Sequence, residues 1–207
     1  MVKHRFTAIA LLLAAVSGAS AQESQNTKAS SEAAQGSQGE HGIGLELRPF
    51  AGRYIPFGSM GADFKGANSF GVQTALELSP YFHVVANVGW TDGTSTIAAL
   101  SNGKTTIMQY DGGVEVNGVV PFGTGWSFRP FAGAGAGARS YSYEEQGVGS
   151  RTGFSGYGTV GAELRRAAIA LRLEGRGYLN AFKQPLIEQT NIRPDAALAL
   201  GLAYHLF

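Results

Sequence analysis

Arginine and carboxylate side chains recur at every second position in several stretches of this chain. Between Ala168 and Leu179, Arg172, Glu174 and Arg176 alternate with leucines or glycines. A guanidinium can bind a carboxylate through two parallel hydrogen bonds, so charged residues that share one face can form a paired ion network. The charged residues with this alternating placement are Glu46, Arg48, Glu77, Asp111, Glu115, Arg129, Arg139, Glu163, Arg172, Glu174 and Arg176.

The period of two is typical of a β-strand with one apolar and one polar face. Ala168 to Leu179 is long enough for the roughly 9 to 11 residues that a tilted strand needs to cross a bilayer. Similar stretches recur along the chain, so the sequence favours a closed transmembrane β-barrel.

The first residues have the features of a secretory signal peptide, which we place at residues 1–21. Lys3 to Arg5 is basic, Phe6 to Val16 is apolar, and Ala19 to Ala21 is a cleavage site of small residues. Residues 22–41 are polar without a hydrophobic period, and we expect a flexible periplasmic leader there. Residues 42–207 are left for the barrel domain.

Eight stretches alternate in this domain, and they predict an all-β, eight-stranded, antiparallel, up-and-down barrel: residues 43–55, 68–78, 82–91, 106–116, 126–139, 157–164, 168–179 and 198–206. Short turns are predicted near Ser79-Pro80, Val120 to Gly125 and Arg165 to Ala167. Longer loops are predicted at Pro56 to Ala67, Asp92 to Lys104, Ser142 to Gly153 and Asn180 to Pro194. This alternation is typical of a membrane barrel whose short turns and termini face the periplasm.

A repeated pentapeptide gives the first and fifth strands the same parity. Arg48-Pro49-Phe50-Ala51-Gly52 recurs as Arg129-Pro130-Phe131-Ala132-Gly133. The glycine run that follows, up to Gly137, is not followed by a helical pattern. We therefore expect these inner-parity glycines to make room for large side chains opposite them, rather than to hold a nucleotide.

The type of cation indicates which face is enclosed. The three lysines after the leader, Lys65, Lys104 and Lys183, lie in predicted loops, whereas the strands carry arginine. A confined space favours arginine because its planar fork can satisfy carboxylates at two points. The interior of an eight-stranded barrel is only wide enough for side chains or one small ligand, so we expect a paired network that fills the lumen.

Catalytic, cofactor and metal motifs are not found in the sequence. His41 falls in the leader, and His83 and His205 fall near the predicted periplasmic strand ends, far from the outer rim where barrel enzymes place such groups. We expect His205 to be a polar group at the lumen floor, bonded to Glu46 on the neighbouring strand. The formal net charge of +1 argues against a nucleic-acid partner.

The Arg-Pro-Phe-Ala-Gly strands, the strand at 168–179 and the aromatic C-terminus resemble the small eight-stranded outer-membrane β-barrel family, which includes outer membrane proteins A, X and W. The resemblance covers Gly42 to Phe207. It implies that Phe207 is the assembly signal read by the barrel assembly machinery, with His205 in the place of the usual second aromatic residue.

From these observations we expect a monomeric, non-enzymatic barrel of a Gram-negative outer membrane. Its partners would be outer-membrane lipid and, during biogenesis, the assembly machinery. It would contribute to membrane integrity and present its loops outside. Two alternatives stay open: a narrow channel for ions or small apolar solutes, which the resemblance to outer membrane protein W allows, and adhesion through the loops.

Overall fold

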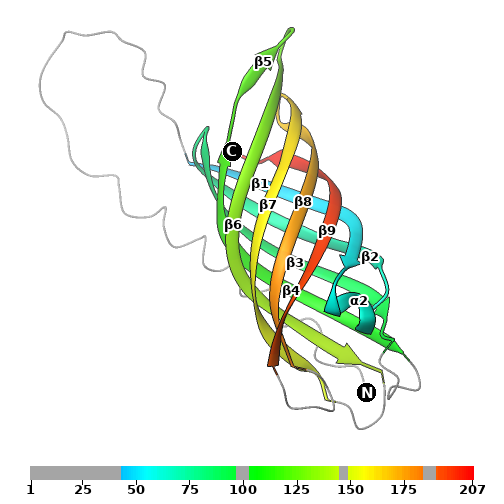
Figure 1. Cartoon of the computed structure of the whole chain (residues 1–207). Helices are drawn as coiled ribbons and strands as arrows, with labels where there is room; N and C mark the ends of the chain where they lie inside the picture. The colour runs from blue at the N-terminus through cyan, green and yellow to red at the C-terminus, as the bar shows by residue number, and fades with distance from the viewer. Residues whose placement is uncertain (1–42, 97–102, 145–148, 184–189) are drawn as a thin grey trace, which may run out of the picture. The chain divides into compact units, whose positions relative to one another are not determined.

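Eight long antiparallel strands close into a barrel in the computed structural model, which describes residues 43–96, 103–144, 149–183 and 190–207 (Figure 1). These strands are β1 (Gly44–Pro56), β2 (Ala67–Ser79), β3 (Phe82–Thr94), β4 (Lys104–Asn117), β6 (Trp126–Tyr143), β7 (Arg151–Arg166), β8 (Ile169–Lys183) and β9 (Thr190–His205). A short strand β5 (Val120–Phe122) and a short helix α2 (Ser59–Asp63) complete the described elements. The predicted signal peptide and leader lie outside the described residues.

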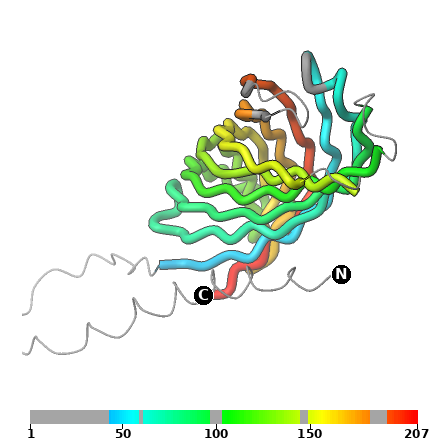
Figure 2. The backbone as a smooth tube through the Cα atoms, turned by 90° about the horizontal axis from the view of Figure 1, so that it is seen from below, coloured from blue at the N-terminus to red at the C-terminus, as the bar shows by residue number. Residues whose placement is uncertain are grey.

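The barrel is closed because β1 pairs with β9 and β4 pairs with β6, while the other pairings in the wall join strands that are consecutive in the chain. Figure 2 shows the first strand of the chain, β1, beside the last, β9. The predicted all-β, up-and-down, eight-stranded architecture is confirmed. No helix among the described residues is long and apolar enough to span a membrane.

The strands are strongly staggered around the barrel. A path from Arg48 through the paired residue on each strand in turn reaches β9 at Arg193, beyond Asp195, the β9 partner of Pro56. The path therefore does not return to the level of Arg48 on β1. The path passes through Gln73, Asn87, Asp111, Gly137, Ser155, Asn180 and Arg193. A stagger of this kind tilts the strands against the barrel axis and fixes the width of the interior.

Alternation separates the two faces of the wall as the sequence predicts. On β8, Leu171 is 48% exposed and Leu173 is 52% exposed, whereas Arg172 between them is 3% exposed. Leu198, Leu200 and Leu202 continue the apolar outer face on β9. An outward band of leucine is typical of a lipid-facing barrel wall, and the buried arginines of the other parity face the lumen.

Several predicted boundaries differ from the structure. The predicted turn at Val120 to Gly125 contains strand β5, and the chain reverses only at Gly123 to Gly125, where both glycines have positive φ. Arg165 belongs to β7, and the turn after it uses Ala167 with a φ of 52°. The predicted loop at Asn180 to Pro194 is too long, because β8 continues to Lys183 and β9 starts at Thr190.

These errors have a common physical cause. Asn180, Arg193 and Asp195 are polar, as loop residues usually are, but they point into a lumen that satisfies polar groups. The strand signal there lies in the alternation with Leu179 and Ile192, which is short and weak. The predicted loop at Ser142 to Gly153 is too long for a similar reason, since β6 continues to Tyr143 and β7 starts at Arg151.

Candidate functional site

The repeated pentapeptide builds the same packing unit in two places on the barrel wall. Phe50 pairs with Gly71 on β2, and Phe131 pairs with Gly161 on β7. Each ring covers the glycine opposite, and a Cβ added at either glycine would overlap the ring. Each phenylalanine therefore lies flat against the inner wall, which leaves the centre of the lumen to the charged side chains.

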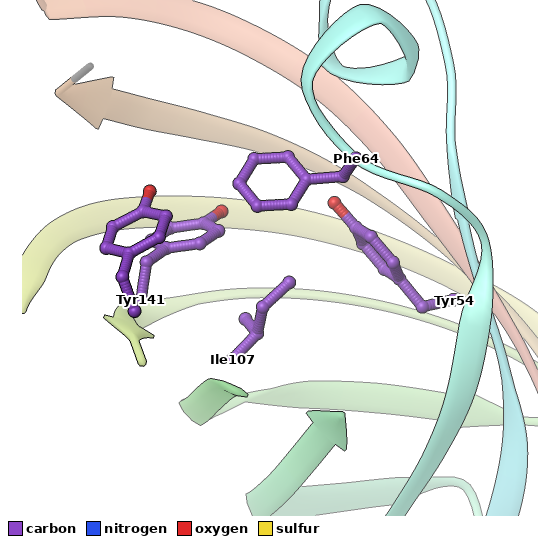
Figure 3. Packing of buried hydrophobic residues seen from close by; sticks show 5 residues of the cluster. Tyr54, Phe64, Ile107 and Tyr141 are labelled. Atoms are coloured by element: carbon purple, nitrogen blue, oxygen red, sulfur yellow. The ribbon is translucent and has the colours of Figure 1, made fainter. Parts of the chain in front are cut away.

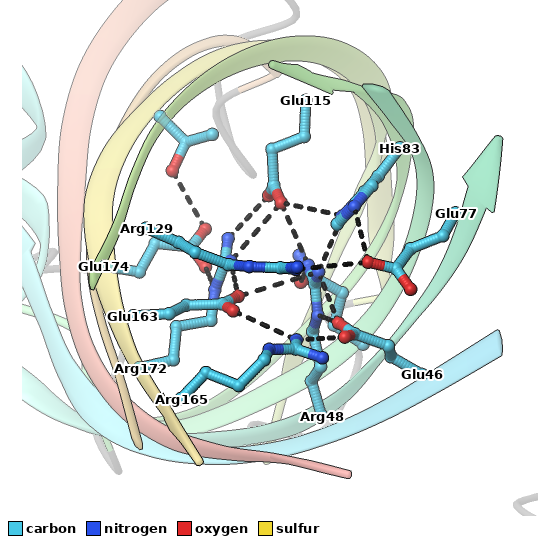
Figure 4. A network of polar contacts seen from close by, with 12 residues as sticks. Glu46, Arg48, Glu77, His83, Glu115, Arg129, Glu163, Arg165, Arg172 and Glu174 are labelled. Atoms are coloured by element: carbon cyan, nitrogen blue, oxygen red, sulfur yellow. Dashed lines mark hydrogen bonds and ion pairs between the residues drawn. The ribbon is translucent and has the colours of Figure 1, made fainter. Parts of the chain in front are cut away.

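Ten residues form the turn-side network, a set of ion pairs across the lumen near the short turns (Figure 4). They are Glu46, Arg48, Glu77, His83, Glu115, Arg129, Glu163, Arg165, Arg172 and Glu174. All but Glu77 and Arg129 are under 9% exposed. They come from seven strands, so the network links most of the barrel wall.

Arg48 lies at the centre of this network. Its Nε donates to Glu46 Oε2 at 2.9 Å, and its Nη1 donates to Gln73 Oε1 at 2.9 Å and to Glu115 Oε1 at 3.0 Å. Its Nη2 lies 3.0 Å from His83 Nδ1. Because a guanidinium can only donate, His83 Nδ1 is an acceptor, and the proton of a neutral His83 is on Nε2, which faces Glu77 at 3.1 Å.

Arg172 closes the other side of the same layer. It contacts Glu115 Oε2 at 2.5 Å, Glu163 Oε1 at 2.6 Å and Glu174 Oε2 at 3.0 Å. Its guanidinium also lies 3.5 Å from the centre of the Phe131 ring. Hydrogen bonds to three carboxylates and an aromatic face hold this arginine in one position.

A second layer, the loop-side group, consists of Gln109, Asp111, Arg139, Arg176, Tyr178, Asn180 and Asp195. Arg139 donates to Asp195 Oδ2 at 2.6 Å and to Gln109 Oε1 at 2.8 Å. Arg176 joins the two layers, since it binds Glu174 and lies 3.4 Å from Asp111 Oδ2. The described polar contacts are therefore continuous along much of the lumen.

A cluster of buried, mostly aromatic side chains, here called the aromatic plug, lies in the loop end of the lumen: Tyr54, Phe64, Ile107, Tyr141 and Tyr143 (Figure 3). Phe64 follows α2 and is 3% exposed. Its segment is fixed to the base of the next loop through the Phe64–Ser95 bridge, and Arg193 binds Asp63. Tyr54 links the plug to the loop-side group by donating to Asp195 Oδ2 at 3.1 Å.

The structure places each charged residue predicted for the network in the lumen, in one or the other of these layers. Sequence reasoning missed Arg165, which binds Glu46 and lies 3.2 Å from Glu163 Oε2, and it missed Asp195. Both could have been found by extending the alternation, because Arg165 shares the parity of Glu163 and Asp195 that of His205. Phe207 extends the contact between the end of β9 and the start of β1, because its backbone oxygen accepts a hydrogen bond from the Leu45 N–H at 3.1 Å.

His205 lies at the mouth of the lumen on the side of the short turns. It is the register partner of Glu46, and its Nδ1 is 3.1 Å from Glu77 Oε2 and 3.8 Å from Glu46 Oε1. The three side chains could approach a metal ion. However, Glu46 is already bound by Arg48 and Arg165 and Glu77 by Arg129, so nearby positive charge opposes a cation there.

Comparison with known proteins matches this architecture to solved membrane barrels. No family model and no curated protein matches the chain. Neisserial surface protein A (NspA) superposes with a TM-score of 0.55 at 13% identity, covering 77% of this chain and 96% of that one. The N-terminal β-barrel domain of Pseudomonas aeruginosa OprF superposes with a TM-score of 0.50 at 13% identity, covering 79% and 97%.

This chain has the fold of the small eight-stranded outer-membrane β-barrels. The apolar outer face of the wall agrees with that fold, and the two together support the location in the bacterial outer membrane that the sequence predicts.

Proposed function

We propose that the protein is a non-enzymatic outer-membrane barrel with a closed lumen, which contributes to membrane integrity and presents its loops to the outside. The observation that carries this proposal is the turn-side network, in which Arg48 and Arg172 both bind Glu115 in the middle of the lumen. An ion that crossed this layer would have to separate buried ion pairs, and removing one partner of such a pair typically costs about 3–5 kcal/mol.

A second barrier supports the same proposal. The aromatic plug adds an apolar layer at the loop end, where the ring centres of Phe64 and Tyr141 lie 5.7 Å apart and Tyr54 connects the plug to the loop-side group. A channel would need both barriers to open together. In a structural barrel both barriers stay closed. One barrier is a charged network and the other is an apolar cluster.

The non-enzymatic part of the proposal rests on the described polar residues. His83 and His205 both face Glu77 at the periplasmic end, and His83 also binds Arg48. Neither lies beside a serine or a water-activating pair at the loop rim, where a barrel enzyme would meet its lipid substrate.

A narrow channel is the second candidate, and one observation favours it. A cavity lies inside the lumen between the turn-side network and the aromatic plug, and Ala197, Ala199 and Gly89 line one side of it. Small side chains there leave room for solvent.

The proposal is tested in cells from which the gene has been removed. We expect such cells to admit more of a dye or antibiotic that an intact outer membrane excludes, and we expect the wild-type chain to restore exclusion. A matched strain carrying a folded Leu171→Arg variant with a damaged lipid-facing surface should restore less. Unchanged exclusion after loss of the gene would contradict a role in membrane integrity.

A further inference from the structure

The hairpin of β5 and β6 extends beyond the other turns at the end of the barrel where the C-terminus lies (Figure 1). It continues the register of β4 and β6, since Asn117 pairs with Phe131 and Val120 pairs with Phe128. Pro130 lies opposite the interruption between β4 and β5 and has no N–H to donate. β5 pairs only with β6, so a two-stranded ribbon projects from the rim.

One face of this ribbon is apolar. Val120 is 52% exposed, Phe122 is 46% exposed and Phe128 is 42% exposed, and the rings of Phe122 and Trp126 stack at 6.4 Å. Their cross-strand pairing places these side chains on the same side, which is the side that carries Val116 on β4. The apolar face of the ribbon therefore continues the lipid-facing surface of the barrel.

The side chain of Arg166 lies at the edge of this apolar face. Arg166, which pairs with Trp126 across β6 and β7, holds its guanidinium 5.3 Å from the centre of the Trp126 ring. Aromatic rings are favoured at the membrane interface, and a guanidinium can bind a phosphate with two hydrogen bonds. An aromatic face with an arginine at its end matches the boundary between acyl chains and lipid headgroups.

We propose that this hairpin is a membrane-docking element, whose face of Val120, Phe122, Trp126 and Phe128 lies in the periplasmic leaflet with Arg166 against a phospholipid phosphate. The short turns place this end of the barrel at the periplasm. An isolated two-stranded hairpin is marginally stable in water, so the apolar face needs a partner. Its continuity with the lipid-facing wall identifies that partner as phospholipid.

The test uses the full chain in phospholipid vesicles with bromine at defined acyl positions. The sequence has two tryptophans, so the Trp90→Phe variant leaves Trp126 as the single fluorophore. We expect bromine near the headgroup end of the acyl chain to quench Trp126 more strongly than bromine near the methyl end. With anionic phosphatidylglycerol added, we expect a blue shift of Trp126 that is lost in Trp90→Phe/Arg166→Gln.

Trp126→Phe, which leaves Trp90 toward the loop end of the wall, is the matched control, and its emission should not depend on Arg166. If Trp126 is not quenched by any brominated lipid and is freely quenched by a water-soluble agent, the hairpin stands in the periplasm and the proposal is wrong. If Trp90→Phe fails to fold, a nitroxide on Phe122→Cys gives the same depth measurement, because the chain has no other cysteine. The result is independent of whether the lumen conducts.

Discussion

Adjacent residues at the end of β7 have opposite environments, although their side chains are identical. Arg165 points inward, where it binds Glu46 and Glu163, and Arg166 points outward over Trp126. Parity alone decides between a buried ion pair and an exposed guanidinium. A local window of sequence shows this parity but not the partners of Arg165, because these depend on which residues β1 brings to the lumen.

This pair gives a matched test of the turn-side network. We expect Arg165→Gln to lower the free energy of unfolding by about 3–5 kcal/mol, because it leaves the buried Glu46 without one of its partners. Arg166→Gln should change it by less than about 0.5 kcal/mol in neutral detergent, as an exposed substitution does. Urea unfolding followed by heat-modifiable gel mobility measures both, and equal effects would contradict the inward assignment of Arg165.

The lipid-facing surface is tested on β8. Leu171→Arg should cost more than Ile169→Arg in bilayers, up to about 2–4 kcal/mol, because Leu171 is on the outer face one outward position farther from the end of the strand and the cost of an arginine rises with depth. Ile169→Arg, at the first residue of the same strand and 56% exposed, should cost only about 0–1 kcal/mol, because an arginine near the interface can reach water. The comparison is made by equilibrium unfolding from vesicles. A Leu171→Arg variant as stable as the wild type would place that side chain away from lipid.

At the scale of elements, the phenylalanine of each pentapeptide packs over a glycine in the neighbouring strand. A Cβ added at Gly161 would overlap the Phe131 ring and the Leu173 carbonyl oxygen, whereas one added at Gly158 on the outer face of β7 would meet no atom within 4 Å. Two glycines three residues apart thus have different roles. Gly161 makes room for packing, and Gly158 does not.

We therefore expect Gly161→Ala to destabilise the barrel by about 1–3 kcal/mol, because overpacking forces the Phe131 ring or the backbone to move. Gly158→Ala should leave the stability unchanged or raise it by about 0.5–1 kcal/mol, since alanine loses less backbone entropy in a strand than glycine. The midpoints of urea unfolding decide between them. Similar losses at both positions would show that the Phe131 ring does not rest on Gly161.

The barrel seam depends on a glycine in a different way. A Cβ at Gly44 would lie 2.7 Å from His205 Cε1 and 2.8 Å from Glu77 Oε2. The side chains of His205 on β9 and Glu77 on β2 therefore meet across β1 at this glycine. We expect Gly44→Val to slow folding into vesicles by separating His205 from Glu77. The gel shift followed over time measures this rate, with Ile43→Val as the control. Equal folding rates would show that this contact forms after the barrel closes.

Much of the fold could be predicted from the sequence because a membrane barrel repeats one simple pattern. The strand count of the wall, the parity of Leu171 and Arg172, and the inward phenylalanines of the pentapeptide all follow from a period of two. The partners of each charge could not be predicted. Arg48 meets residues from β2, β3, β4 and β7, and this set depends on the stagger of the closed sheet.

The loop side of the molecule was also beyond sequence reasoning. Phe64 occurs in a polar loop, and contacts with distant segments, among them the bridge to Ser95 and the Arg193–Asp63 ion pair, bring it over Tyr141. The β5 hairpin was hidden within a predicted turn because Pro121 and several glycines surround its apolar residues. In both places contacts between distant segments override the local composition.

For the whole molecule, the central claim is that the lumen is closed by a buried ion network and an aromatic plug. Single-channel recording in a planar bilayer tests it most directly, on a sample whose unboiled and boiled forms migrate differently on a gel. We predict a silent wild-type barrel, and also a silent Phe64→Ala variant, because the turn-side network alone blocks ions. Discrete, reproducible conductance steps from the folded wild-type protein would contradict the closed lumen and favour the channel.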